Sequence, residues 1–241
     1  MAARRARLVV ERYATPALVL RVVPYGEADA VVTFFGETTG RVSAMARGAR
    51  KASKSRPQID SMHTLLITLE ERPGAELMTL RSSELSTLRL RLTGRLDALE
   101  AAGRALRWLR AVMPARHADP GVWVTISWLL DELDVPGPLN ETALLATAGL
   151  RLLDALGWGF DLDQCIVCGK ACPPAQSGLL DPARGGLVCR ACGGASSLVR
   201  ASLRDDARAA AAGTRTIAAH DADQVLAWVE AGLAAHGGVV G

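Results

Sequence analysis

The chain has 241 residues, of which 49% are hydrophobic and 22% are charged. This length allows two or three compact units, and the apolar share is enough for packed interiors, which excludes an intrinsically disordered chain. No run of about 18 uncharged apolar residues occurs, and no apolar signal core follows the basic N-terminus. We therefore expect a soluble, cytoplasmic protein with no membrane-spanning segment.

The net charge is only +3, but it is unevenly distributed along the chain. Residues 1–60 hold 11 Lys and Arg against 5 Asp and Glu, whereas the remaining residues hold 17 against 20. Such asymmetry suggests that the N-terminal part binds a polyanion. A solvated basic surface remains an equally simple interpretation of the charge alone.

Residues 17–82 alternate between apolar and polar with a period of two and are divided by turn residues, a pattern typical of half-buried strands. The predicted strands are 17–23, 30–35, 41–47, 64–70 and 76–81. The last two form a hairpin candidate around Arg72-Pro73-Gly74. Five short strands in about 65 residues favour a small, partly open barrel over a sandwich.

Beyond residue 90 the apolar residues recur every three or four positions, which predicts amphipathic helices over 96–113, 122–133, 140–156, 198–212 and 225–235. Asp119 and Asn140 are expected N-caps, Gly157 a left-handed C-cap, and Asp221 with Gln224 a capping box. The predicted fold class is α+β. The expected domains are a barrel with an N-terminal arm, a helical bundle, a metal-binding insert and returning helices, over 1–84, 85–160, 161–197 and 198–241.

All five cysteines of the chain lie in one short stretch. Cys165-x2-Cys168 and Cys189-x2-Cys192 are separated by 20 residues, and each pair is followed by a glycine. Four thiolates in two such knuckles can surround one Zn²⁺ tetrahedrally and leave no position open for water, so we expect a structural zinc ribbon. A redox pair and chance placement are the weaker alternatives. Cys172 is the spare cysteine, expected to be a partly buried thiol.

The segment 41–56 carries six basic residues and no acid, interspersed with Gly, Ala and Ser. Such a loop or barrel face can lie close to a phosphate backbone. The alternative is a solvated, flexible loop. The candidate DNA-binding residues are Arg41, Arg47, Arg50, Lys51, Lys54 and Arg56.

Motifs for catalysis were sought and not found in the sequence. It has no Gly-x4-Gly-Lys-Ser/Thr loop for phosphate binding, no deaminase-type His-x-Glu motif, and its histidines form no ligand pair. We therefore expect no enzymatic activity and propose no catalytic residue.

Two stretches resemble a known family. ALVLRVVPYGEADAVVTFF, followed by GRVSAMARGARK, is similar to the N-terminus of the bacterial RecO family of recombination mediators, and the helical region and late cysteine pairs match the family's further layout. The resemblance implies an OB-fold barrel, a helical bundle and a zinc ribbon. It also places the family's basic barrel face on residues 41–56.

The resemblance implies a non-enzymatic function in DNA repair, in the cytoplasm and associated with the nucleoid. Members bind single- and double-stranded DNA, anneal complementary strands and, with RecR, help RecA load onto DNA coated with the single-strand-binding protein SSB. The SSB C-terminal tail is an implied partner of the helical region, where Arg104, Arg107, Arg110 and Arg116 are candidates by helical position. The extension with Arg4, Arg5 and Arg7 departs from the family pattern.

Two other functions remain open from the residues alone. One is a zinc-ribbon adaptor that binds only proteins, and the other is an unrecognised nuclease or transferase that uses the ribbon as a lid. Salt-dependent DNA binding separates the first from a DNA-binding mediator, and metal-dependent turnover would identify the second.

Overall fold

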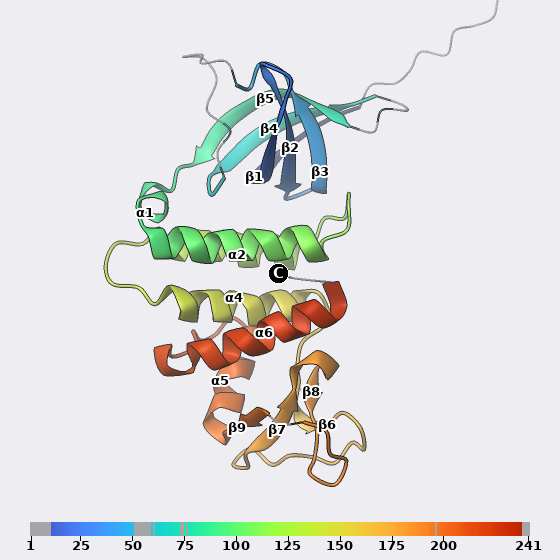
Figure 1. Ribbon diagram of the computed structural model, residues 1–241, viewed down its shortest axis with the longest axis vertical. Coiled ribbons are helices and arrows are strands. Elements are labelled where there is room, and N and C mark those ends of the chain that lie inside the picture. Colours follow the sequence, from blue (N-terminus) through green and yellow to red (C-terminus); the bar gives the residue numbers. More distant parts are fainter. Residues whose placement is uncertain are drawn as a thin grey trace, which may run out of the picture. The chain divides into compact units, whose positions relative to one another are not determined.

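A computed structural model describes residues 11–50, 59, 61–72, 75, 77–195 and 197–237 of the chain (Figure 1). The chain divides into two compact units. The first unit holds the chain up to Arg89 together with Met113–Pro120, and the second holds Leu90–Val112 and the chain from Gly121 onward. Among the described helices, none has the length and apolar character needed to cross a bilayer.

The described strands of the first unit form a closed barrel in the order β1-β2-β3-β5-β4, which is the OB-fold arrangement. Their bounds are β1 Glu11–Tyr25, β2 Asp29–Gly36, β3 Gly40–Ala46, β4 Thr64–Glu71 and β5 Met78–Thr87. The prediction that the barrel is partly open is wrong. Strands β3 and β5 pair in parallel at Ala44–Met78 and Met45–Thr79, and this pairing closes the barrel. All strands lie where the alternation places them, although β1 and β5 are longer.

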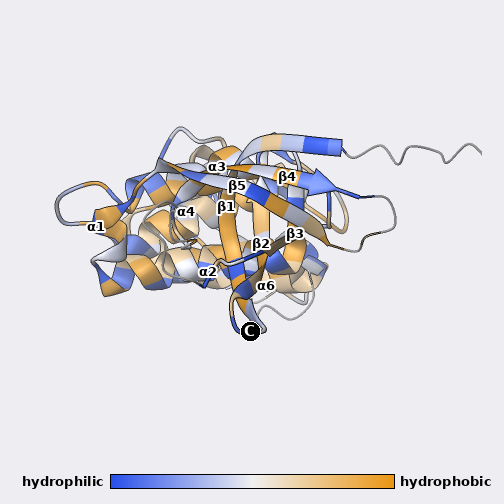
Figure 2. Ribbon diagram, turned by 90° about the horizontal axis from the view of Figure 1, so that it is seen from above, coloured by the Kyte–Doolittle hydropathy of each residue, from blue (hydrophilic) through white to orange (hydrophobic). Residues whose placement is uncertain are grey.

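The barrel interior is filled by alternate residues of each strand. Phe34 and Ile67 are fully buried there, and the paired parts of β1 and β2 are largely hydrophobic (Figure 2). Each such side chain contributes about 1.5–3 kcal/mol when it leaves water. The segment Met113–Pro120 closes on β3, where the backbone N–H of Arg116 donates to the carbonyl of Arg41 over 2.8 Å.

Helices dominate the second unit. Those within the described residues are α1 Leu90–Thr93, α2 Leu96–Val112, α3 Pro120–Glu132, α4 Glu141–Ala155, α5 Ala201–Ala211 and α6 Ala222–Gly237. Helix α4 is buried along most of its length, as the central helix of a bundle must be. The Asn140 cap is confirmed, since its side chain accepts the N–H of Ala143 over 2.7 Å, and Gly157 takes the left-handed conformation at φ 75°.

The capping box expected at the start of α6 is wrong. Asp221 ends a short 3-10 turn, Ala219–Asp221, and its buried carboxylate accepts a hydrogen bond from Arg200 instead. Gln224 donates to the carbonyl of Leu198 over 2.9 Å. Both side chains therefore tie α6 to the segment that precedes α5 rather than to its own first turn.

A small sheet in the order β6-β8-β7-β9 lies between α4 and α5 in the sequence and belongs to the same unit. Its strands are β6 Asp161–Cys165, β7 Gly178–Asp181, β8 Gly186–Leu187 and β9 Ser197–Val199, with a 3-10 turn at Pro182–Arg184. We refer to residues 161–199 as the ribbon. The strands are very short, so backbone pairing alone gives this sheet little stability.

Candidate metal centre and nucleic-acid interface

The four predicted metal ligands come together at one end of the ribbon. The Sγ atoms of Cys165, Cys168, Cys189 and Cys192 all lie within 4.8 Å of one another. Those of Cys168 and Cys189 are 3.8 Å apart. In a tetrahedral zinc centre with Zn–S bonds of about 2.3 Å, the sulfurs are also separated by about 3.8 Å. The cluster therefore has the dimensions of a site for one metal ion.

Both cysteine pairs are held in the same type of turn. The N–H of Gly169 donates to the carbonyl of Cys165 over 2.8 Å, and the N–H of Gly193 donates to that of Cys189 over 3.1 Å. The two glycines have φ of 71° and 68°, the left-handed conformation that side chains other than glycine rarely adopt. This is why a glycine follows each pair in the sequence, and it aims backbone amides at the sulfurs.

The four thiols differ in acidity. The N–H of Cys189 lies 3.3 Å from the Cys165 sulfur, and together with amides of the first knuckle it lowers the pKa of Cys165 to about 6. The Cys192 thiol donates hydrogen bonds to the sulfurs of Cys189 and Cys168, and these bonds raise the pKa of Cys192 to about 12. A bound divalent cation would displace such a shared proton and balance the thiolates. The donor set therefore fits a closed, structural zinc site.

A residue that the sequence did not single out attaches the ribbon to the helices. Arg204 of α5 is 1% exposed, and its guanidinium donates to four ribbon carbonyls, those of Leu162, Cys172, Pro173 and Gln176. It also lies 3.1 Å from the Cys172 sulfur. The only available signal was its place beside Leu203 and Ala207 on the apolar stripe of α5.

Cys172 lies outside the four-sulfur cluster, as expected for the spare cysteine. Its side chain is half-buried, and its backbone N–H donates to the carbonyl of Asp163 over 2.7 Å. This bond folds the segment after the first knuckle back onto β6. The structure therefore assigns Cys172 a packing position beside Arg204.

The predicted DNA-binding residues fall into three environments. Arg41 of β3 is half-buried, and its Nε donates to the carbonyl of Met113 over 2.8 Å, so part of its guanidinium is occupied within the barrel unit. Arg47 and Arg50 follow β3 and are exposed; Arg50 donates to the carbonyl of Gly26 over 3.0 Å. Lys51, Lys54 and Arg56 lie outside the described residues.

Three of the four arginines expected by helical position belong to a helix. Arg104, Arg107 and Arg110 are on α2, and Arg104 forms an ion pair with Glu230 at 2.5 Å. The expectation is wrong for Arg116, because α2 ends at Val112. Arg116 belongs to the first unit, where it pairs with Glu71 at 2.6 Å.

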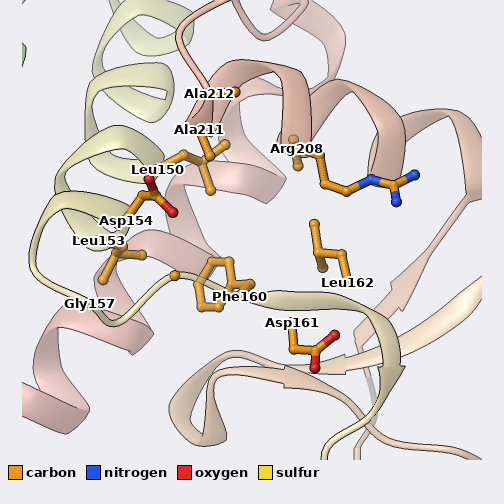
Figure 3. Close-up of a pocket in the computed structure, with 12 residues that line it drawn as sticks. Leu150, Leu153, Asp154, Gly157, Phe160, Asp161, Leu162, Arg208, Ala211 and Ala212 are labelled. Atoms are coloured by element: carbon orange, nitrogen blue, oxygen red, sulfur yellow. The ribbon is translucent and has the colours of Figure 1, made fainter. Parts of the chain in front are cut away.

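A hollow of about 410 Å³ lies in the second unit between α4, α5 and the start of β6 (Figure 3). Phe160 and Leu162 form part of its apolar lining, with Asp154 at one end and Arg208 at the other. Arg208 is already paired with Asp163 and Asp205. The remaining charge at this hollow is therefore negative, which disfavours an acidic ligand.

These parts define an OB-fold protein with a helical unit that carries a four-cysteine ribbon, and OB folds commonly bind oligonucleotides. The protein-family model described as "Recombination protein O N terminal" matches residues 10–89 of this chain. The family model described as "Recombination protein O C terminal" matches residues 78–202. The chain belongs to the RecO family of DNA repair proteins. Membership supports a role as a recombination mediator in DNA repair.

Relatives named DNA repair protein RecO are similar over most of the chain. That of Anaeromyxobacter sp. (strain Fw109-5) is 32% identical over 190 residues, 78% of this chain and 73% of the relative. That of Geobacter metallireducens is 31% identical over 185 residues, which cover 76% of this chain and 74% of the relative. That of Anaeromyxobacter sp. (strain K) is 34% identical over 187 residues, which cover 76% of this chain and 71% of the relative. The similarity therefore includes both units.

Proposed function

We propose that this protein is a recombination mediator, acting in the cytoplasm at the nucleoid, that binds single- and double-stranded DNA and anneals complementary strands. With RecR it helps RecA load onto DNA coated with SSB. The observation that carries the proposal is the pair of family matches, which together cover residues 10–202. The closed OB-type barrel, in which an acid-free basic segment begins in β3, supports it from the structure.

The proposed DNA site is the segment that continues β3, with Arg41, Arg47, Arg50, Lys51, Lys54 and Arg56. Arg47 and Arg50 are exposed, so their side chains are more accessible to a phosphate than that of half-buried Arg41. Arg50 and Arg41 would exchange their bonds to the carbonyls of Gly26 and Met113 for the phosphate contact. The segment has no Asn or Gln before Gln58 for a paired contact to a base, so binding should be insensitive to sequence.

The salt dependence of affinity tests this site. Each neutralised phosphate contributes a slope of about −0.9 on duplex DNA and about −0.7 on single strands. The variant with Arg50, Lys51, Lys54 and Arg56 changed to alanine should therefore bind every sequence more weakly, with a slope flatter by several units. Replacement of Arg91 and Arg184, two exposed arginines of the second unit, controls for the loss of positive charge. Absence of salt-dependent binding by the unmodified protein would favour the protein-binding adaptor instead.

Mediation is tested by strand annealing with and without SSB on the DNA. The unmodified protein should anneal complementary strands in both cases, and the four-residue variant should do so more slowly. A loss of annealing restricted to SSB-coated strands would instead place the defect in partner binding. Annealing at the same rate by both proteins would contradict the assignment of the DNA site.

For the SSB tail, an acidic peptide, we propose the α2 arginines rather than the hollow of Figure 3. Arg107 is exposed on α2, and Arg104 and Arg110 lie about one turn to either side. The hollow presents Asp154 and Asp161, which would repel acidic residues. Calorimetry with an acidic peptide ending in Phe should detect binding that is weakened by Arg107→Ala. No heat at tens of micromolar peptide would contradict this.

We propose Zn²⁺ as the metal held by Cys165, Cys168, Cys189 and Cys192. Four thiolates in a closed set favour a structural ion, whose contribution is to the folding of the ribbon rather than to a reaction. Elemental analysis of freshly purified, reduced protein should give about one zinc per chain. A metal-free preparation with a folded ribbon would contradict the assignment.

A further inference from the structure

Glu70 of β4 is a carboxylate in an unusual place. Its neighbour Leu69 belongs to the barrel core, so alternation along the strand directs Glu70 to the outer surface. A glutamate on such a surface is normally solvated. Glu70 is nevertheless only 3% exposed, because arginine side chains from three places in the chain cover it.

Arg81 of β5 donates hydrogen bonds to both oxygens of the Glu70 carboxylate. Its Nε donates to Oε2 over 2.8 Å and its second terminal nitrogen donates to Oε1 over 2.5 Å. Leu80 pairs with Leu69 and Ser82 pairs with Thr68, so Arg81 is the extra residue of a β-bulge. Bulges re-aim side chains, and this one turns Arg81 onto Glu70. The two hydrogen bonds from Arg81 lower the pKa of Glu70 to about 2, so the carboxylate is ionised at neutral pH.

Two more arginines contact the same carboxylate, each through its Nε. The Nε of Arg72 lies 3.2 Å from Oε1, and that of Arg12, on the neighbouring strand β1, lies 3.5 Å from Oε2. Their side chains are 61% and 70% exposed. Apart from Glu70, neither arginine has a hydrogen-bond or ion-pair partner among the residues that the structure describes. Each therefore presents the outer edge of its guanidinium to solvent.

These residues, which we call the Glu70 cluster, are Arg12, Glu70, Arg72 and Arg81, and they carry a net charge of +2. Satisfying a carboxylate needs one well-oriented arginine, and Arg81 already provides it. The next acid on the outer face of β5 is Glu84, which pairs with Leu66, four residues along β4. That spacing is about 13 Å, beyond the screening length of about 8 Å at physiological salt. Glu11 and Glu71, the chain neighbours of Arg12 and Glu70, contact Tyr13 and Arg116 instead. The excess positive charge of the cluster is therefore not neutralised by an ion pair with another described residue.

We propose that the Glu70 cluster is a second phosphate-binding site for the nucleic-acid backbone, in which Arg12 and Arg72 contact the phosphate oxygens. Glu70 and Arg81 are positioning residues, because Glu70 contacts the Nε of the other two guanidinium groups and Arg81 fixes Glu70. A planar guanidinium presented in this way matches the two oxygens of a phosphodiester. This inference rests on the proposed DNA binding and adds a site on β1 and β4 to the segment after β3.

The test measures duplex binding by fluorescence anisotropy between about 50 and 200 mM salt, with the full-length protein. Arg12→Ala with Arg72→Ala should flatten the slope of log affinity against log salt by about 1.8, so that the variant loses about 12-fold less affinity over this range. Arg91→Ala with Arg184→Ala removes the same charge from exposed positions in the second unit and should leave the slope unchanged. Arg12→Ala alone, at the most exposed member, should flatten it by about 0.9.

Each outcome has a separate meaning. If the unmodified protein shows no salt-dependent binding, the proposed DNA-binding function fails, and this inference fails with it. If the unmodified protein binds but both variants keep its slope, only the phosphate site is overturned and the cluster is an ion-pair network of the barrel. Should the double variant not fold, as judged by circular dichroism, the single Arg12→Ala variant decides alone, because its loose 3.5 Å contact contributes little to stability.

Discussion

The barrel and the ribbon are stabilised by different kinds of interaction. The barrel has a core of buried apolar residues contributed by every strand. In the ribbon, the buried hydrophobic residues are few, among them Leu162, Leu180 and Leu187, and the strands are two to five residues long. Its stability must therefore come from polar groups: four cysteines at one end and Arg204 at the other.

The difference shows how arginine is used in each region. At the ribbon, the Arg204 side chain of α5 is buried and donates to backbone carbonyls of the ribbon, so it is part of the fold. In the barrel, Arg12 and Arg72 touch Glu70 with one nitrogen each and leave the others outward. An arginine is structural where protein groups accept hydrogen bonds from its guanidinium N–H donors. It is available for a ligand where some of these donors face solvent.

Metal removal should have the largest effect, and only in the ribbon. Metal binding in small zinc domains is worth about 10–16 kcal/mol and is mostly folding energy. Cys165→Ser should therefore abolish zinc binding and raise hydrogen exchange throughout residues 161–197, while barrel amides stay protected. Exchange followed by mass spectrometry measures both regions in one experiment.

Cys172→Ser is the control for this experiment, since that sulfur lies outside the four-cysteine cluster. It should retain about one zinc per chain and the protection of the ribbon. Loss of barrel protection in Cys165→Ser would show that the two regions are not independently stabilised. Unchanged ribbon exchange would show that the sulfurs do not hold the fold.

Arg204→Ala should have the next largest effect. It leaves four carbonyls without their donor, and a buried unsatisfied group costs about 1–3 kcal/mol, so the second unit should lose about 3–5 kcal/mol. The Trp228 indole donates to Ser197 of the ribbon over 2.9 Å, so tryptophan fluorescence during urea unfolding is a suitable measurement. Arg208→Ala is the matched control on the same helix. The Arg208 side chain is partly exposed and ion-paired, so the loss should be about 1 kcal/mol or less. Equal losses would contradict the role of Arg204.

The elements and the metal centre were predictable because their signals are local. Strand alternation, helical spacing, the Asn140 cap and the Cys-x-x-Cys-Gly spacing each depend on neighbouring residues. Arg204 and the Glu70 cluster were not predictable, since they join residues far apart in the chain. Arg12 meets Glu70 only through the register of β1 on β4, and Arg81 reaches it only through a bulge. Neither the register nor the bulge has a mark in the sequence.

The smallest effect should appear in the barrel at acid pH. The pKa of Glu70 falls from 4.5 to about 2 in the folded barrel, chiefly because Arg81 donates to it. A lowered folded-state pKa gives stability that is complete above the unfolded pKa and is lost as the pH falls through the folded one. The stabilising contribution of Glu70 should therefore decline between about pH 4.5 and pH 2. Glu70→Gln lacks this titration, so its melting temperature, followed by circular dichroism, should lie below that of the unmodified protein at pH 6 and approach it near pH 2. A gap that stays constant across this range would show that Arg81 does not stabilise the ionised carboxylate, and the Glu70 cluster would then lose its anchor.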